Sequence, residues 1–307
     1  MRVEPDDRRG EGAREAKHRR RPARRGQVLA VSLLSAALAS GPDAAPSPQD
    51  TAGEAIVLGL VVVDQAKRDT FEALLRRARS QLATSGDALR RRQAETWLAF
   101  RAAEPAREGH LQFAYVLAPP PEPTPNDSAA LLAAVVPPEF GNRLRETLAS
   151  GSPQRLLTLR LIQDFSAGHA SALPTAVAPV EAPDSPASGL FLPGDAGLVV
   201  TVVRSAREDD FALILAKMKE ALWKSEDPVR RRQAAGWKVF RATGLTPEGH
   251  ARYVFFVNPA VPDADYSVSK LLAEGFPEEA TLLYARMREA LAPGGFRLTL
   301  SRLSPEP

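Results

Sequence analysis

Residues 90–102 read RRRQAETWLAFRA and residues 230–242 read RRRQAAGWKVFRA, so nearly the same segment occurs twice, 140 residues apart. The likeness continues on both sides, because residues 69–119 share 19 identities with residues 209–259 over 51 gap-free positions. Self-similarity of this length indicates two copies of one structural unit. We therefore predict two similar domains within the 307-residue chain.

Each copy begins with the pattern of a strand followed by a helix. Residues 55–63 (AIVLGLVVV) and 197–203 (GLVVTVV) are short and rich in valine, which favours buried strands. Apolar residues at relative positions 0, 3, 4, 7 and 11 then mark one face of an amphipathic helix. These residues are Phe71, Leu74, Leu75, Ala78 and Leu82 in the first copy, and Phe211, Ile214, Leu215, Met218 and Leu222 in the second.

The repeated segment itself predicts a short helical turn and then a strand. Asp227 before Pro228 is a favourable helix start. The second copy continues with a strand over 237–242, its hairpin partner over 250–257, helices over 266–274 and 277–291 that stop at Gly294-Gly295, and a strand over 296–303. The first copy gives equivalent elements over 128–136, 138–149 and 155–162. The order strand–helix–strand–strand–helix–strand is the ferredoxin-like βαββαβ plan.

Residues 253–257 (YVFFV) are apolar on both faces of their strand, so both faces of that sheet need a cover. Helices cover one face of a ferredoxin-like sheet, and the other copy is the nearest apolar surface. We therefore predict an α+β fold, with tandem ferredoxin-like repeats packed sheet to sheet as a pseudo-dimeric α+β barrel. The expected divisions are an export signal and basic leader (1–45), a spacer (46–53), repeat 1 (54–163), a Pro/Ala-rich linker (164–195), repeat 2 (196–303) and a tail (304–307).

The leader has the order of an export signal. Arginines at 19–21, 24 and 25 precede an apolar run of 12 residues over 28–39, and small residues follow it. This run is shorter than the roughly 20 residues that cross a bilayer. We expect a periplasmic or secreted protein cleaved after Ala39 or Ala45. The alternative is an uncleaved signal that anchors the N-terminus in the membrane.

Charge and cysteine content exclude several classes of partner and site. The formal charge of +3 comes from the first 45 residues, which hold 10 Lys/Arg and 6 Asp/Glu out of totals of 40 and 37. The body is thus close to −1, which argues against a nucleic-acid partner. The chain has no cysteine and no closely spaced histidine pair, so we predict no metal site and no cofactor.

Three duplicated pairs of side chains are the candidate ligand-binding residues: Trp97, Arg101, His110, Trp237, Arg241 and His250. Each tryptophan and arginine are four residues apart on a predicted strand and share one face. In one interpretation that face lines a cavity between the sheets, where arginine binds an anion. In the interpretation that we favour, tryptophan packs in the core and arginine ends at the rim. We expect Phe100 and Phe240 to pack under the helices.

The histidines and the arginine triplets have plainer interpretations beside the functional ones. His110 and His250 each follow Glu-Gly at a predicted hairpin turn, so each either serves in proton transfer or ligand binding or simply begins a strand. Residues 90–92 and 230–232 form either solvated helical turns or patches that contact anionic lipid or cell-wall polymer. No motif marks a catalytic nucleophile.

The topology and the duplication resemble the dimeric α/β-barrel superfamily in a fused tandem form. Residues 232–242 (RQAAGWKVFRA), 264–266 (ADY) and Phe276-Pro277 resemble exported bacterial proteins of unknown function. This resemblance implies the fold and the export signal, and it supplies no catalytic residue. The superfamily includes monooxygenases and haem enzymes, so the fold alone does not select a function.

We predict an exported, non-enzymatic binding or interaction module, monomeric with an internal pseudo-twofold axis. Its expected partner is a small molecule or a component of the cell envelope, and it contacts a membrane only through an uncleaved leader. The alternative is a small-molecule or haem-binding enzyme of the dimeric α/β-barrel type that uses the cavity between the sheets. In the haem-binding form of this alternative, the protein would require haem as its cofactor.

Overall fold

The computed structural model describes residues 54–119, 138–150, 155–166 and 189–303, all of which belong to the unit Thr51–Pro307. The predictions for the leader, the spacer, the helix over 128–136, most of the linker and the tail lie outside the described residues. Among the helices that are described, none is long and apolar enough to cross a membrane.

Both repeats contain the predicted order of elements. Repeat 1 comprises β1 (Ala55–Asp64), η1 (Gln65–Lys67), α1 (Arg68–Ala83), α2 (Ala88–Thr96), β2 (Leu98–Ala102), β3 (His110–Leu117), α4 (Pro138–Thr147) and β4 (Arg155–Asp164). Repeat 2 comprises β5 (Ala196–Val203), η2 (Ser205–Arg207), α5 (Glu208–Lys224), α6 (Pro228–Gly236), β6 (Trp237–Leu245), β7 (Ala251–Val257), α7 (Val268–Gly275), α8 (Ala280–Ala290) and β8 (Leu291–Arg302).

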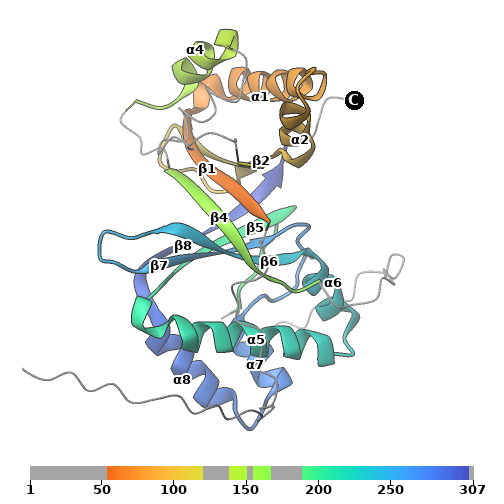
Figure 1. The fold of residues 1–307 in the computed structure, drawn as a ribbon, viewed down its shortest axis with the longest axis vertical. Helices are drawn as coiled ribbons and strands as arrows, with labels where there is room; N and C mark the ends of the chain where they lie inside the picture. The colour runs from red at the N-terminus through yellow and green to blue at the C-terminus, as the bar shows by residue number, and fades with distance from the viewer. Residues whose placement is uncertain (1–53, 120–137, 151–154, 167–188, 304–307) are drawn as a thin grey trace, which may run out of the picture. The chain divides into compact units, whose positions relative to one another are not determined.

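The strands close into one antiparallel barrel in the order β1-β3-β2-β8-β5-β7-β6-β4. Each repeat contributes four strands in the same relative order, and the pairs β2–β8 and β4–β6 join the two sheets at their edges. Helices α1, α2 and α4 cover repeat 1, and α5 to α8 cover repeat 2, with the barrel between them (Figure 1). The predicted α+β barrel of two ferredoxin-like repeats is therefore confirmed.

The arginine-rich turns are short helices with side-chain caps. Asp87 accepts a hydrogen bond from the Leu89 amide at 2.9 Å, and Asp227 accepts one from the Val229 amide at 2.8 Å. A carboxylate at this position satisfies an amide that has no partner within the helix. Each short helix then leads directly into β2 or β6, so the repeated segment sets where the second strand of each repeat begins.

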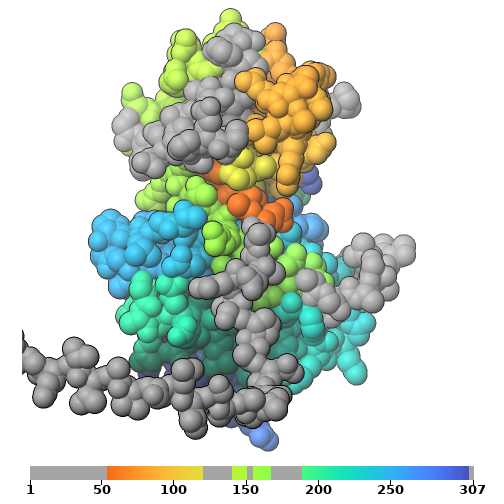
Figure 2. All heavy atoms as spheres, in the orientation of Figure 1, coloured from red at the N-terminus to blue at the C-terminus, as the bar shows by residue number. Residues whose placement is uncertain are grey.

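The barrel interior is a packed apolar cluster to which both repeats contribute. Phe100 of β2 and Phe256 of β7 meet there with ring centroids 5.9 Å apart. In the space-filling view, residues of repeat 1, in orange to green, adjoin residues of repeat 2, in teal to blue, on the outer face (Figure 2). The two sheets therefore bury their inner faces against each other, as the two-sided apolar strands predict.

The expected faces of β2 and β6 are reversed in the structure. Phe100 and Phe240 lie in the barrel interior, whereas Trp97 and Trp237 pack in the two layers between sheet and helices. The structure confirms that tryptophan and phenylalanine lie on opposite faces of each strand. The phenylalanines, however, face the barrel interior and not the helices. Helices α2 and α6 fold back over the sheet and bury Ala94 and Ala234 in the same layers as the tryptophans.

Gly294 and Gly295 do not stop helix α8, contrary to the prediction. The helix ends at Ala290, and β8 begins at once and includes both glycines. They lie where the β5–β8 register shifts, Gly294 has φ +107°, and a Cβ on Gly295 would lie 2.7 Å from the Val200 carbonyl oxygen. The two glycines therefore form a β-bulge that a larger residue would not fit.

Candidate functional site

The tryptophans and arginines predicted from sequence do not line a cavity between the sheets. Trp97 and Trp237 are each 2% exposed and belong to the helix-side layers. Arg101 donates to Glu72 of α1 at 3.3 Å, and Arg241 donates twice to Glu208 of α5, at 2.7 and 3.1 Å. The cavity interpretation is therefore wrong, whereas the favoured placement of tryptophan in the core agrees with the structure.

Arg241 belongs to a polar cluster at the start of α5. The hydrogen bond from Arg241 lowers the pKa of the Glu208 carboxyl. Burial, and then the hydrogen bond to Glu208, raises the pKa of the Tyr253 phenol. In repeat 1 the position equivalent to Glu208 is occupied by Arg68. Arg101, the equivalent of Arg241, therefore pairs with Glu72, one helical turn further along α1.

The two histidines lie at the hairpins that begin β3 and β7. His110 has Nδ1 2.8 Å from the Glu108 carbonyl oxygen and Nε2 3.3 Å from Nη2 of Arg107. Both contacts are satisfied by a neutral imidazole protonated at Nδ1. His250 uses its amide to donate to Thr246 at 3.1 Å. In the part of the chain that the structure describes, no three His, Cys, Asp or Glu residues gather as a metal site would need.

The arginine triplets differ between the repeats despite their identical sequence. Arg230 is 5% exposed and donates to both carboxylate oxygens of Glu274 at 2.9 Å, and also to the Gln233 side chain at 2.8 Å. Arg90 is exposed, and its contact with Asp87 is 3.9 Å long. The prediction of a solvated turn therefore does not hold for Arg230, because a carboxylate of α7 binds it.

A cavity of about 820 Å³ lies between helices α1 and α2 and the strand edge formed by β2 and β8. We call it the α1–α2 cavity. Its lining residues are Ala73, Leu75, Arg76, Arg77, Arg79, Ser80, Ala83, Arg91, Ala94, Glu95, Trp97, Leu98, Ala99, Arg302 and Leu303. The volume is within the range of small-molecule sites, about 300–1,000 Å³.

Arginines dominate the polar part of this lining. Five of the lining residues are arginines and one, Glu95, is a carboxylate. Arg79 and Arg91 are held by backbone carbonyl groups, with Arg79 donating to Ala94 at 3.3 Å and Arg91 donating to Ser85 at 2.7 Å. These contacts fix the guanidinium groups without neutralising them, so the cavity favours an anionic ligand.

Arg76 adds a donor that the surrounding protein leaves unused. Its Nη1 lies 3.8 Å from Glu72, while its Nε is buried without a hydrogen-bond partner among the described residues. A buried donor without a partner is costly and uncommon. An anionic group bound in the cavity would supply the missing acceptor.

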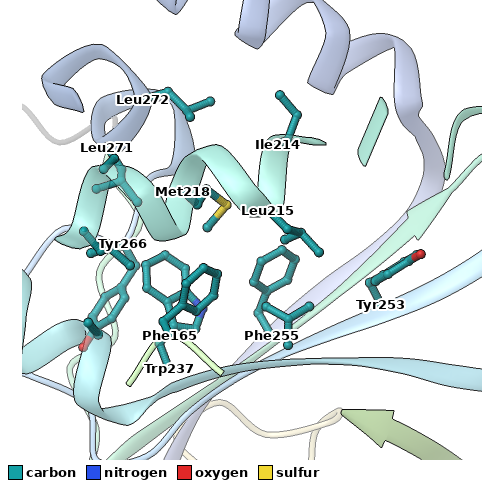
Figure 3. Packing of buried hydrophobic residues seen from close by; sticks show 14 of the residues in the cluster. Phe165, Ile214, Leu215, Met218, Trp237, Tyr253, Phe255, Tyr266, Leu271 and Leu272 are labelled. Atoms are coloured by element: carbon teal, nitrogen blue, oxygen red, sulfur yellow. The ribbon is translucent and has the colours of Figure 1, made fainter. Parts of the chain in front are cut away.

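The equivalent space in repeat 2 is filled with aromatic side chains. Phe165, which follows β4, is fully buried, and its ring centroid lies 5.3 Å from that of Trp237 (Figure 3). Trp223 donates from Nε1 to the Phe165 carbonyl oxygen at 3.2 Å. Its equivalent in repeat 1 is Ala83, and Arg76 is replaced in repeat 2 by Ala216. The two copies have therefore diverged at these positions, where repeat 1 has Arg76 and Ala83 and repeat 2 has Ala216 and Trp223.

Strand pairing explains how Phe165 reaches the second repeat. Strand β4 pairs with β6 as far as Asp164 and Lys238, after a register shift, and the Phe165 amide then donates to the Trp237 carbonyl oxygen at 3.2 Å. On the opposite edge, the amide of Leu303 donates to Ala99 at 2.9 Å, and Leu303 forms part of the cavity wall. Of the six candidate residues predicted from sequence, Trp97 lines this cavity. The sequence signal for the cavity is that Arg76 and Ala83 of repeat 1 are replaced by Ala216 and Trp223 in repeat 2.

Comparison with known proteins gives structural likeness alone. No family model and no curated protein matches the chain. A provisionally named monooxygenase from Fusobacterium nucleatum is 11% identical, over 83% of this chain and 94% of that one, with a TM-score of 0.42. Chlorite dismutase from Candidatus Nitrospira defluvii, in a variant form, is 11% identical over 82% and 93%, with a TM-score of 0.41.

These neighbours correct one prediction and assign no residue. Both are described as enzymes, which contradicts the predicted non-enzymatic module, but a likeness at 11% identity gives no activity to this chain. Their TM-scores of 0.42 and 0.41 transfer no site to this chain. The fold rests on the strand order, and the candidate site rests on the α1–α2 cavity.

Proposed function

We propose that the protein is an enzyme that acts on a small anionic molecule bound in the α1–α2 cavity. The observation that carries this proposal is the divergence of the two repeats. Repeat 2 fills the position with Phe165 and Trp223, whereas repeat 1 leaves about 820 Å³ lined by five arginines. Arg77, Arg79 and Arg91 correspond to the basic residues Lys217, Lys219 and Arg231, so the divergence that matters is Arg76 for Ala216 and Ala83 for Trp223.

The lining offers charged groups for one part of the ligand and apolar side chains for another. Arg76, with its unpartnered Nε, and the neighbouring guanidinium groups would bind a carboxylate or phosphate. Leu75, Ala99 and Leu303 would contact the apolar part of the ligand. The preferred substrate class is therefore a small organic acid with an apolar body.

Glu95 is the carboxylate of the lining and the candidate for proton transfer. In this proposal it accepts a proton from a carbon beside an electron-withdrawing group of the substrate. The electron pair left on the substrate is stabilised by the guanidinium groups that already hold its anionic end. Return of the proton from Glu95 to another atom of the substrate completes an isomerisation, with no change in oxidation state.

Haem does not fit this cavity. Its described lining contains no histidine, cysteine, methionine or tyrosine that could bind the iron axially. His110 and His250 begin the hairpin strands β3 and β7, and neither belongs to the lining. We therefore derive no step through haem.

Proton exchange provides a direct test. Phenylpyruvate carries a carboxylate, an aromatic ring and an acidic methylene group, so exchange of its methylene protons in D₂O can be followed by NMR. We expect the protein to accelerate this exchange and Glu95→Gln to lower the acceleration by about 100-fold while phenylpyruvate still binds. Glu104→Gln, an exposed residue outside the cavity, is the matched control.

Filling the cavity gives the second arm of the same test. Ala83→Trp introduces the residue that repeat 2 carries at this position, Trp223, and should abolish both binding and exchange while the thermal midpoint is retained. Exchange that survives both Glu95→Gln and Ala83→Trp would rule out this cavity as the active site. Binding without any exchange over a series of 2-keto acids would rule out the proton-transfer mechanism.

We also propose that the enzyme works outside the cytoplasm as a fused tandem barrel. The order of arginines, apolar run and small residues in the first 45 residues supports export. N-terminal sequencing of protein from an exported fraction should give a start near residue 40 or 46. An intact Met1 in the cytosol would contradict this location.

A further inference from the structure

A second cavity, of about 480 Å³, opens at one end of the barrel. We call it the barrel-end cavity. It is lined by Leu60, Val62, Ala106, Arg107, Gln112, Arg155, Gly294, Gly295, Phe296, Arg297 and Leu298. Leu60 and Leu298 also belong to the packed barrel interior, so the floor of this cavity is the end of the apolar core between the two sheets.

Strand register places two polar side chains on the inner face of this opening. Arg155 is the direct partner of Leu60, and Gln112 is the direct partner of Val62. Directly opposed residues in antiparallel strands lie on the same face of the sheet. Because Leu60 faces the barrel interior, the side chains of Arg155 and Gln112 extend over the end of the barrel.

An aromatic ring and a cation meet at this opening. The guanidinium carbon of Arg155 lies 5.7 Å from the centre of the Phe296 ring, and Phe296 packs against the interior cluster. Arg107 also belongs to the lining, and its Nη2 contacts Nε2 of His110 at 3.3 Å. The residues described around this cavity include no aspartate or glutamate, so its charge is positive.

The glycine bulge of β8 forms one wall of the cavity from backbone atoms alone. Gly294 and Gly295 carry no side chain, and they form a bulge in β8 between Ala292 and Phe296. A Cβ on Gly294 would meet no atom closer than 3.7 Å, so the wall is open at Gly294, whereas a Cβ on Gly295 would lie 2.7 Å from the Val200 carbonyl oxygen.

We propose that the barrel-end cavity is a second binding site, which takes an aromatic carboxylate. The ring of the ligand packs on Phe296 and Leu298, where the apolar interior ends, and its carboxylate accepts hydrogen bonds from Arg155 and Gln112. Arg107 adds positive charge at the rim. This site is separate from the α1–α2 cavity, because the two linings share no residue, and it stands without the proposed enzymatic function.

Benzoate titration of the full-length protein tests this site. Calorimetry measures the affinity, and the amide shifts of Gly294 and Gly295 report where benzoate binds. Arg155→Gln should weaken benzoate binding at least tenfold and should remove the glycine shifts. Arg160→Gln, an exposed arginine on the same strand that is outside the lining, should leave both unchanged. Circular dichroism melting verifies that both variants fold.

Each part of the proposal has its own failing outcome. Benzyl alcohol that binds as tightly as benzoate would overturn the role of the carboxylate, and inorganic phosphate that binds as tightly would overturn the role of the ring. Loss of benzoate binding in Ala83→Trp would place the ligand in the α1–α2 cavity and overturn the second site. Retained binding in that variant, with loss in Arg155→Gln, supports the site whatever the outcome of the phenylpyruvate exchange.

Discussion

Phe165 packs on Trp237 with ring centroids 5.3 Å apart, although Phe165 follows the last strand of repeat 1 and Trp237 begins a strand of repeat 2. The strand before Phe165 pairs with the strand that begins at Trp237, so the end of repeat 1 completes the core of repeat 2. Trp97 is the equivalent tryptophan of repeat 1, and the α1–α2 cavity lies beside it. The same position thus serves packing in one copy and provides a cavity in the other.

Replacing Phe165 should destabilise the protein strongly. The side chain is fully buried in the helix-side core of repeat 2, and Phe→Ala in a core costs about 3–5 kcal/mol of unfolding free energy. Urea denaturation of Phe165→Ala measures this loss. Phe191→Ala is the matched control, because Phe191 is 38% exposed, and its cost should stay within about 1 kcal/mol. Equal losses for both variants would contradict the packing role of Phe165.

Arg230 and Arg90 should differ in energy although the same sequence surrounds them. Arg230 is almost fully buried and donates two hydrogen bonds to Glu274, whose side chain is 44% exposed. Arg230→Ala also removes the donor to the buried Gln233 side chain and should cost about 1–3 kcal/mol. Arg90 has one exposed contact at 3.9 Å, and Arg90→Ala should cost less than about 1 kcal/mol. Urea denaturation of both variants measures the two losses of unfolding free energy. Similar losses would show that the Glu274 contact contributes little.

The duplication predicted the architecture because a repeated pattern constrains both copies at once. Residues 89–103 alone could form one helix, but the second copy has Gly236 in this segment, and the structure has a short helix followed by a strand in both repeats. The two-sided apolar pattern of β7 predicted that the sheets face each other, and the closed barrel confirms it.

The candidate site was harder to predict, because periodicity shows which residues share a face and not which side that face meets. The alternation of Trp97 and Phe100 was correct, and the sides were exchanged. The cavity itself depends on contacts between distant segments, such as Phe165 over Trp237. No spacing within one copy carries that information, whereas a comparison of the copies at Ala83 and Trp223 does.

A methyl group on Gly59 should destabilise β1. A Cβ at this position would lie 2.0 Å from Cζ of Tyr115, and overpacking of this kind costs about 1–3 kcal/mol. Repeat 2 has Val199 and Phe255 at the equivalent positions, so the larger strand residue faces a ring without a hydroxyl group. Thermal and urea unfolding of Gly59→Ala measure the loss.

Gly86→Ala is the control for this substitution, because a Cβ on Gly86 meets no atom within 4 Å. Its unfolding free energy should equal that of the unchanged protein within about 0.5 kcal/mol. If Gly59→Ala is equally neutral, the Tyr115 ring must move aside freely, and its tight packing against β1 would be disproved.

The Glu208–Arg241 pair should make stability depend on pH in the acid range. The hydrogen bond from Arg241 lowers the pKa of Glu208 from its ordinary value of 4.5. A carboxyl with a lowered pKa in the folded state stabilises the fold above its unfolded pKa, and this contribution is lost as the pH falls through the folded value. The gap in unfolding free energy between the unchanged protein and Glu208→Gln should therefore be largest near neutral pH and should shrink below about pH 4.5.

Arg241→Gln provides the matching experiment from the other side of the pair. Without the guanidinium, the pKa of Glu208 loses the largest cause of its depression, so this variant should lack the same acid-dependent component. Urea denaturation at about pH 7, 5, 4 and 3 separates this effect from a simple loss of packing, since a packing loss is the same at every pH. A gap that stays constant over this range would mean that Glu208 does not change its proton affinity on folding, and the ion pair would then only position the start of α5 against β6.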